Sequence, residues 1–443
     1  MRRILATSLF AVIAGLWVAG CGGAKTAQNN GPAPIRVWHW MTDREDAFNE
    51  LAKRYKEETG QEVSFELYAP TDIYEQKVRA AAQTDGLPEI YGILGEMRGL
   101  ASFIQAGHVR SLEDVMSADN NAWRNEFFPK ALAVNAFQPN NTYGVEPGVY
   151  GVPIDVMSIQ LYYNKKLLAK LGLDPNQPPQ TWEDFMHVGK LANDQGLIGF
   201  VSGWAELWLI DCYATTYAIH TMGMEKVQQT YEGQVAYTDP DWQRVFGLFS
   251  EMRDSGMLAE GIVTMVNKRA EQLFANEQAV FAFNGTWGIN VYDTMNPNLD
   301  YGIMLPPRVG NNEVVTWGGA GSSFFVNAKS DRQDAAIAFL KWLTDVPQQK
   351  YLLEQTKNIP ANRVAAAELP EKLQAFAKVI DAAVHPRLFA LQEDSKVIET
   401  FDKGVQSILI GESTADQVSQ KVAQAKEREA SRQAKLAEAN GQR

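Results

Sequence analysis

The stretch LFANEQAVFAFNGTWGINVYDTMNPNLDYGIMLPP, residues 273–307, places a strand, a turn and a tryptophan in direct succession. The apolar run Ala279–Phe283 has the length and composition of a buried strand, and Asn284-Gly285 supplies a turn that tolerates positive φ. Trp287 follows this turn. Because ligands of α/β sheets bind beyond the strand ends, the stretch predicts an α/β domain that presents an indole to a cleft.

A second segment, VVTWGGAGSSFFVNAKS at residues 314–330, repeats the order of β-type run, tryptophan and glycine. Its candidate ligand residues are Trp317, Gly318 and Gly319. Burial in the core is the alternative for both tryptophans, because most Trp side chains are buried. The glycine beside each indole favours a ligand site, since it leaves room for another molecule to approach.

The segment 35–97 alternates apolar runs with amphipathic stretches. Strands are expected at 35–40, 63–67 and 88–94, with helices between them. This alternation is typical of a mainly parallel sheet flanked by helices, whose carboxyl edge faces the ligand. Trp38 suits the sheet face as well as the cleft. The ligand candidates along this edge are Trp40, Asp43, Asp72, Tyr74 and Glu96.

Four segments of the chain resemble the sugar-binding members of the family 1 extracellular solute-binding proteins, the family of maltose-binding protein. They are the two stretches quoted above, YGVPIDVMSIQLYYNKKLLAKLGLDPNQPPQTWEDF at 150–185, and DAAIAFLKWLTDVPQQKYLLEQTKNIPANR at 334–363. The resemblance implies a two-lobed α/β fold that closes on a mono- or oligosaccharide. It also implies a monomer that delivers its solute to the permease subunits of an ABC importer.

The resemblance further implies where the chain passes between the lobes. Crossings are expected at residues 151–155, at Tyr301–Pro307 and at Asn358–Pro360, and several crossings form a hinge between rigid lobes. The expected domains are an N-lobe of residues 35–152 and 307–356, a C-lobe of residues 153–306 and 357–430, and a frayed tail of residues 431–443. This division places Trp317 in the N-lobe.

The first crossing and the segment after residue 199 add further ligand candidates. The Asp155 carboxylate at the crossing either accepts hydrogen bonds from solute hydroxyls or locks the strand in place. Trp204 follows a strand and a glycine turn, so it is a ligand candidate, whereas its spacing of four from Trp208 assigns Trp208 to the core. Glu206 and Arg387 are further candidates. Aromatic faces and polar side chains together suit a pyranose ring, which has an apolar face and a rim of hydroxyls.

The N-terminus has the features of a bacterial lipoprotein signal. A basic start and an apolar run precede Val18-Ala19-Gly20-Cys21, which resembles a lipobox, whose cysteine is acylated and becomes the first mature residue. We expect a signal peptide at 1–20, a flexible tether at 21–34, and an extracytoplasmic protein anchored to a bacterial membrane through Cys21. An ordinary signal peptide with a chance cysteine is the alternative.

Charge and motifs narrow the function classes. The formal net charge of −12, without a long basic run, argues against nucleic acid as a partner. The chain shows no G-x-S-x-G, H-E-x-x-H or Walker-type motif, and its 5 histidines are scattered, so we expect no enzyme, no cofactor and no metal site. A carbohydrate-active hydrolase or lyase stays open, as does a binding protein for a polyol, a glycerol phosphodiester or a peptide.

Overall fold

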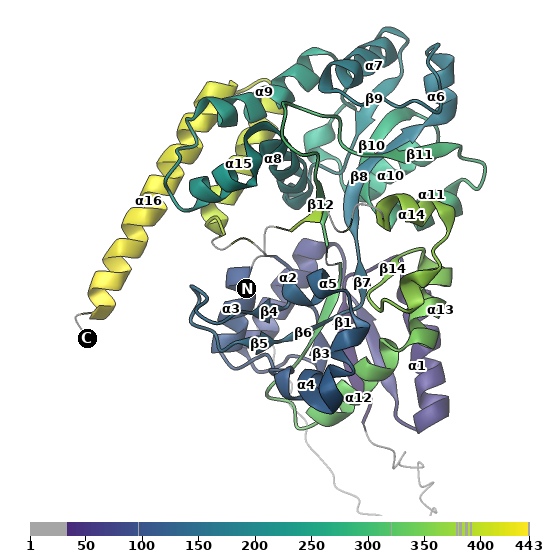
Figure 1. Cartoon of the computed structure of the whole chain (residues 1–443), viewed down its shortest axis with the longest axis vertical. Helices are drawn as coiled ribbons and strands as arrows, with labels where there is room; N and C mark the ends of the chain where they lie inside the picture. The colour runs from purple at the N-terminus through teal and green to yellow at the C-terminus, as the bar shows by residue number, and fades with distance from the viewer. Residues whose placement is uncertain are drawn as a thin grey trace, which may run out of the picture. The chain divides into compact units, whose positions relative to one another are not determined.

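The computed structural model describes residues 33–95, 97–319, 321–377, 380, 383–385, 389 and 392–441. The predicted signal peptide, Cys21 and the tether up to residue 32 lie outside the described residues. So do the ligand candidates Glu96 and Arg387. Residues Pro34–Arg443 form one unit by their contacts, and it contains two large sheets (Figure 1).

The sheet of the N-lobe has five strands in the order β2-β1-β3-β13-β6. β1 (Ile35–His39) pairs in parallel with β2 (Val63–Leu67) and β3 (Ile90–Tyr91), so the predicted parallel arrangement of this segment is confirmed. β13 (Ser323–Val326) adds antiparallel to β3 and to β6 (Gly151–Pro153). The sheet is therefore mixed, with its parallel part built from the N-terminal residues.

Helices cover the N-lobe sheet. Their apolar residues recur with the period of the helix, so each helix has one apolar face to pack against the sheet. In α1 (Glu45–Thr59) the buried residues include Phe48, Leu51 and Tyr55, and Gly60 ends the helix at φ 77. Phe48 stacks on Phe65 of β2 with ring centroids 4.5 Å apart. The other helices of this lobe are α2 (Thr71–Gln83), α3 (Met97–Gln105), α4 (Glu113–Asn121), α5 (Pro129–Ala133), α12 (Gln333–Leu343) and α13 (Val346–Thr356).

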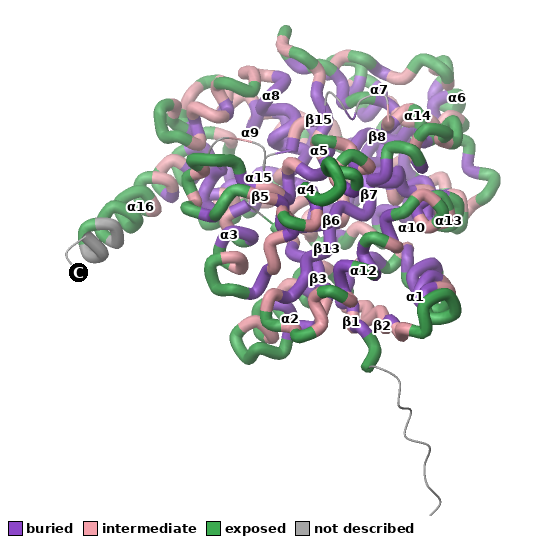
Figure 2. The backbone as a smooth tube through the Cα atoms, turned by 60° about the horizontal axis from the view of Figure 1, so that its bottom comes forward, coloured by how far each residue is buried: buried purple, intermediate pink, exposed green. Residues whose placement is uncertain are grey.

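The sheet of the C-lobe is organised around β8 (Ser158–Asn164), in which every residue is buried. Its strands follow the order β15-β12-β8-β10-β9, and β11 also pairs with β8. β8 pairs directly with β10 (Ala279–Gly285), β11 (Tyr301–Met304) and β12 (Thr316–Gly318). β9 (Ile198–Val201) joins the sheet through β10, and β15 (Ala383–Val384) joins it through β12. Helices on both faces explain the continuous burial, which Figure 2 shows along β8.

The C-lobe helices contribute to two clusters of buried apolar side chains. The first cluster takes residues from α6 (Lys165–Lys170), α7 (Trp182–Asp194), α8 (Leu207–Tyr231), α9 (Pro240–Asp254), α15 (Ser395–Leu409) and α16 (Ala415–Gly441). The second takes residues from α10 (Asn267–Ala275), α11 (Gly288–Met295) and α14 (Glu371–Ala377). α16 stays helical to Gly441, where the sequence predicted a frayed tail, because its Ala, Glu, Lys, Gln and Arg residues are strong helix formers.

The chain passes between the sheets at three places, one of which differs from the prediction. β7 (Asp155–Val156) lies between β6 and β8, and it pairs with β14 (Ile359–Pro360). The expected crossing at Tyr301–Pro307 is wrong, because β11 and β12 both pair with β8. The chain leaves the C-lobe sheet only after Gly318 and joins the N-lobe sheet at Ser323. Trp317 therefore belongs to the C-lobe.

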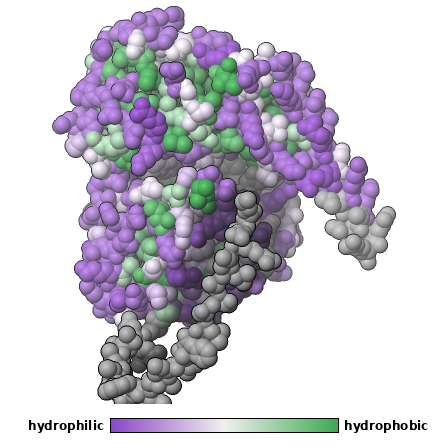
Figure 3. All heavy atoms as spheres, turned by 180° about the vertical axis from the view of Figure 1, so that it is seen from behind, coloured by the Kyte–Doolittle hydropathy of each residue, from purple (hydrophilic) through white to green (hydrophobic). Residues whose placement is uncertain are grey.

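The short elements complete the description. They are β4 (Ala136–Phe137), β5 (Gly148–Val149), η1 (Arg124–Glu126), η2 (Ile262–Thr264) and η3 (Ala365–Ala367). On the face seen in Figure 3, hydrophilic side chains predominate and hydrophobic ones form separate patches. Within the described ranges, no helix is both long and apolar enough to cross a membrane.

Candidate functional site

Two half-buried tryptophans of the C-lobe face each other at the end of β10. Trp287 follows β10 and precedes α11, and its ring lies over Gly285, where a Cβ would come within 1.9 Å of the indole. Trp208 lies in the first turn of α8, with its ring centroid 6.0 Å from that of Trp287 and the planes inclined at 52°. Gly285 thus has a steric reason to be glycine, because the indole occupies the space of a side chain.

Polar side chains fix the surroundings of this indole pair. Glu206 accepts hydrogen bonds from Asn267 N at 2.8 Å and from Trp208 Nε1 at 3.2 Å. Glu271 accepts from Asn267 Nδ2 at 2.9 Å and from Asn284 Nδ2 at 3.0 Å. Asn267 Oδ1 is buried and has no hydrogen-bond partner among the described residues. We call Glu206, Trp208, Asn267, Glu271, Asn284 and Trp287 the C-lobe wall.

The electrostatics of the wall are dominated by its carboxylates. Burial, together with the negative charges of Asp43 and Glu206, raises the pKa of Glu271 to about 7, although hydrogen bonds from Asn284 and Trp287 act in the opposite direction. Asp43 belongs to the N-lobe, so one of the charges that act on Glu271 comes from the other lobe. Near neutral pH Glu271 exists as a mixture of acid and carboxylate.

Trp317 and its glycines lie beside β8, in register with β10. Trp317 and Gly285 both pair with Ile159, from opposite sides of β8. The Trp317 indole is half-buried, with its centroid 4.5 Å from the ring of His385, and its Nε1 has no partner among the described residues. A Cβ at Gly318 would meet Met157 O at 2.4 Å, whereas at Gly319, at φ 117, it would meet open space. Trp317 Nε1 is therefore a buried donor that the described residues leave unsatisfied.

The N-lobe contributes Trp40, which is half-buried above Gly92 and Tyr74. A Cβ on Gly92 would come within 2.1 Å of the Trp40 ring, and the Trp40 and Tyr74 centroids are 5.1 Å apart. Tyr74 is 1% exposed, and its hydroxyl donates to Trp38 O and Gly92 O and accepts from Gly92 N. The sequence prediction that Tyr74 contacts a ligand is corrected, because its side chain is buried and its hydroxyl binds backbone atoms of Trp38 and Gly92.

Asp155 takes the second of its two predicted roles and locks the crossings together. Its carboxylate forms a buried ion pair with Arg44 and accepts from Ser322 N at 2.6 Å. Arg44 also lies 3.4 Å from Asp43, which accepts from Asn358 Nδ2 at 2.9 Å. Burial lowers the pKa of Arg44, but the charges of Asp155 and Asp43 outweigh it and raise the pKa. We call Asp43, Arg44, Asp155, Ser322 and Asn358 the hinge cluster.

Trp204 and Trp208 exchange the roles that the sequence predicted. Trp204 is 0% exposed, packs against Phe200 and Tyr213, and its carbonyl accepts from Gln406 of α15. The spacing argument failed because α8 begins at Leu207, so Trp204 lies in the preceding turn and is not on the same helix as Trp208. The prediction that Trp204 binds ligand is therefore wrong, and Trp208 is the half-exposed indole.

The sequence missed most of the polar residues of the wall. Glu271 and Asn267 are four apart on α10, which places them on one helix face, and this spacing was the available signal. Asn284 was interpreted only as a turn residue. Asp72, in the first turn of α2, is exposed, and the described contacts do not join it to the indoles.

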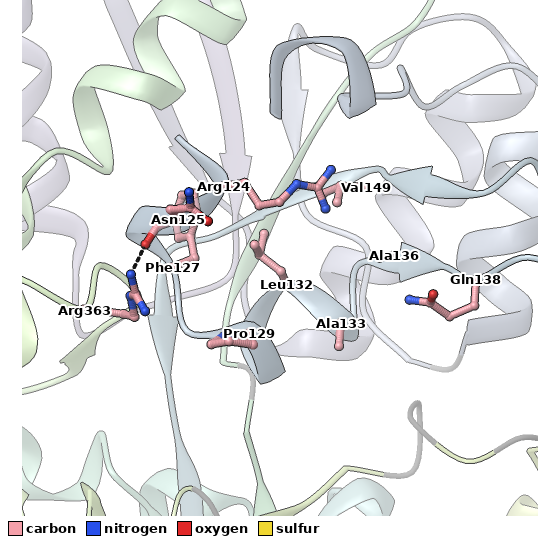
Figure 4. A pocket seen from close by; sticks show the side chains of 10 residues that line it. All are labelled: Arg124, Asn125, Phe127, Pro129, Leu132, Ala133, Ala136, Gln138, Val149 and Arg363. Carbon is pink, nitrogen blue, oxygen red and sulfur yellow. Dashed lines mark hydrogen bonds between the residues drawn. The ribbon is translucent and has the colours of Figure 1, made fainter. Parts of the chain in front are cut away.

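A separate hollow lies beside η1 and α5, away from the predicted candidates (Figure 4). Its apolar lining includes Phe127, Leu132 and Val149. Two arginines border it: Arg124, which pairs with Glu113, and Arg363, which donates to Asn125 O. None of the sequence-predicted ligand residues lines this hollow.

Comparison with known sequences gives a consistent family. A model described as bacterial extracellular solute-binding protein matches residues 50–379. An ABC transporter extracellular-binding protein of Pyrococcus horikoshii is 21% identical over 426 residues, which cover 92% of this chain and 91% of the relative. The sn-glycerol-3-phosphate-binding periplasmic protein of Brucella abortus is 23% identical over 384 residues, which cover 85% and 84%.

Solved structures share the fold of this chain. A chitin oligosaccharide binding protein aligns with a TM-score of 0.73 at 22% identity, covering 89% of this chain and 98% of its own. A maltose-bound protein of T. maritima aligns with a TM-score of 0.74 at 18% identity, covering 88% and 98%. The predicted two-lobed α/β fold is thereby confirmed.

Proposed function

From the premise that this chain belongs to the family of bacterial extracellular solute-binding proteins, we propose that it is the receptor of an ABC importer and binds a carbohydrate between its lobes. The family implies an extracytoplasmic location. The names of similar proteins support a sugar as the solute, since two aligned structures are a chitin oligosaccharide binding protein and a maltose-bound protein.

The observation that carries this proposal is the indole pair of the C-lobe wall, bordered by hydrogen-bonding groups. Trp208 and Trp287 leave part of their rings exposed, whereas Trp204 nearby is fully buried. An aromatic face covers the C–H face of a pyranose, and amides and carboxylates satisfy its hydroxyls. Asn267 Oδ1 and Trp317 Nε1 are an acceptor and a donor without partners among the described residues. The hydroxyl groups of a sugar would supply a hydrogen-bond partner for each of these two atoms.

The N-lobe side of the proposed site is Trp40. A ligand that contacts Trp40 and the C-lobe wall together stabilises the closed form, because only that form brings both surfaces to it. Moving the population from mostly open to mostly closed needs about 5 kcal/mol of differential binding. Stacking and hydrogen bonds from both lobes are contacts of the right kind.

The test is a thermal-shift screen of mono- and oligosaccharides, polyols, glycerol phosphodiesters and short peptides, followed by calorimetry of each hit. A true ligand raises the unfolding midpoint by mass action. We expect sugars to raise it, and Trp287→Ala to remove most of that shift. Trp342→Ala is the matched control, because Trp342 is another half-buried tryptophan, whose Nε1 donates to Glu58 at 2.7 Å in the N-lobe. A sugar shift that survives Trp287→Ala would contradict the site.

Two finer parts of the proposal concern turnover and anchoring. The site is proposed to bind its solute without breaking a bond, so chromatography should return an incubated oligosaccharide unchanged, and shorter products would favour the hydrolase or lyase alternative.

Cys21 is proposed to carry the lipid anchor. Metabolic labelling with a radioactive fatty acid should label the protein, and Cys21→Ala should release it from the membrane fraction.

A further inference from the structure

The C-lobe wall combines its indoles with carboxylates. Glu206 is held against Trp208 Nε1, and Glu271 interacts with both Asn284 and Trp287. Each indole of the wall therefore lies beside a carboxyl group. The N-lobe adds Asp43, whose negative charge acts on Glu271. Acidic groups from both lobes thus surround the place where the proposed function puts the ligand.

Among the residues that the structure describes, the cations named near this place are either paired with carboxylates or exposed to solvent. Arg44 is buried between Asp155 and Asp43, so a single guanidinium serves two carboxylates. On α10, the side chains of Lys268 and Arg269 are exposed, so solvent screens their charges more than it screens the charges of buried groups. Among the described groups named here, negative charge exceeds positive charge.

The excess of negative charge at this place bears on which class of solute can bind. A phosphate monoester carries a charge of roughly −1.5 to −2 near neutral pH, and proteins hold it with arginine, lysine or clustered backbone N–H groups. Some similar proteins are named for binding sn-glycerol-3-phosphate. The carboxylates of the C-lobe wall would repel such a solute, because like charges brought together without screening destabilise a complex.

Resting on the proposed function, we propose that this site takes uncharged or amino-bearing sugars and rejects anionic solutes such as glycerol phosphates and uronates. Glu271 and Glu206 set this discrimination. Both Glu206 oxygens accept hydrogen bonds, so Glu206 also positions Trp208 and the start of α10. Glu271, which accepts hydrogen bonds from Asn284 and Asn267, is the second of these two specificity-determining residues.

The experiment measures affinity for solutes that differ in one charged group. Calorimetry at pH 8 and low salt compares each neutral sugar that binds with its amino and uronic counterparts, and compares glycerol with sn-glycerol-3-phosphate. We expect the amino sugar to bind at least as tightly as the neutral sugar, and the uronate to bind about tenfold or more weakly. Added salt should narrow both differences, because it screens the charges.

Glu271→Gln and Glu206→Gln test which residues are responsible. Each should narrow the ratio of neutral to anionic affinity about threefold or more, while Glu183→Gln, which removes an exposed carboxylate of α7, should leave the ratio unchanged. The ratio of neutral to anionic affinity is informative even for a variant with lower stability. Lost packing lowers the affinity for all solutes by the same factor, so it leaves their ratio unchanged. If a variant does not fold, the series on the unchanged protein still decides the proposal.

The outcomes separate this proposal from the proposed function. If a uronate or sn-glycerol-3-phosphate binds as tightly as its neutral counterpart, the charge discrimination is overturned, although a solute receptor remains. If no sugar of any charge binds, the proposed function fails together with this inference. If neutral sugars bind but neither glutamine variant changes the ratio, Glu271 and Glu206 do not set the selectivity.

Discussion

The hinge cluster and the C-lobe wall are both built on carboxylates, but their surroundings differ. In the hinge cluster, Asp155 is enclosed by the Arg44 guanidinium and the Ser322 amide. In the wall, Glu271 is enclosed by neutral amides and by other acids, and its pKa is raised to about 7. The same side-chain chemistry thus serves to hold the crossings in one region and to border a ligand in the other.

The difference teaches how to judge a polar residue near a hinge. A carboxylate whose charge is neutralised by a buried cation of its own chain, as that of Asp155 is by Arg44, has little capacity left for a solute. Asp43 lies between the two cases, since it accepts from Asn358 and faces Arg44, yet its charge acts on Glu271. Partners, more than position in the sequence, distinguish a structural acid from a ligand-binding one.

Removing the cation of the hinge cluster should have the largest effect on stability. Arg44→Met leaves Asp155 and Asp43 buried without their guanidinium, and we expect a loss of about 3–5 kcal/mol in the free energy of unfolding. Urea denaturation followed by circular dichroism measures it. Lys190→Met, which removes one partner of an exposed pair with Asp194 on α7, should change stability little. An Arg44→Met protein that is stable but binds no sugar would instead place the hinge cluster in the ligand site.

The pH dependence of the wall should be the next largest effect. The pKa of Glu271 is about 7 in the folded protein against an ordinary value of 4.5, so the folded state binds the additional proton. Its contribution to stability is therefore full below about pH 4.5 and is lost as pH rises to about 7. The loss amounts to up to about 3 kcal/mol. Urea denaturation of wild type and Glu271→Gln at several pH values measures it.

The Glu271→Gln protein provides the control for other titrating groups. The substituted glutamine keeps an acceptor oxygen for the two amides and cannot ionise, so the variant should gain stability relative to wild type between pH 4.5 and 7. A difference between the two proteins that stays constant with pH would mean that Glu271 titrates at its ordinary pKa. Glu271 would then be ionised at neutral pH, so the wall would carry more negative charge than its raised pKa implies.

The sequence predicted local structure better than it predicted which segments meet. The alternation of strand and helix over residues 35–97 gave the parallel pairing of β1 with β2 and β3, because hydrophobic period reports on secondary structure directly. The same period does not say which sheet a strand joins. β11 and β12 were therefore misassigned, β11 as a crossing between the lobes and β12 as part of the N-lobe.

The candidate site was predicted in part for the same reason. Trp287 and Trp317 were predicted as ligand residues from the glycines that flank them, but the space beside Gly285 is filled by the Trp287 ring itself. Trp204 was chosen over Trp208 because nothing in the local pattern shows that α15 covers Trp204. The pKa of Glu271 is raised first by burial and then by the charges of Asp43 and Glu206, and all three depend on segments that only the fold brings together.

Trp208→Ala should change stability less than Arg44→Met or the titration of Glu271 does, but it should clearly weaken sugar binding. Trp208 is half-buried at the edge of the C-lobe core, and its ring faces Trp287 at 6.0 Å. Losing one stacking surface should weaken sugar binding by about 1–2 kcal/mol, roughly tenfold, measured by calorimetry. Trp204→Ala should destabilise the protein by about 3–5 kcal/mol, because it leaves a cavity in the core. If Trp208→Ala instead lowered stability and spared affinity, the half-exposed indole would belong to the core, and the wall would have to be drawn around Trp287 alone.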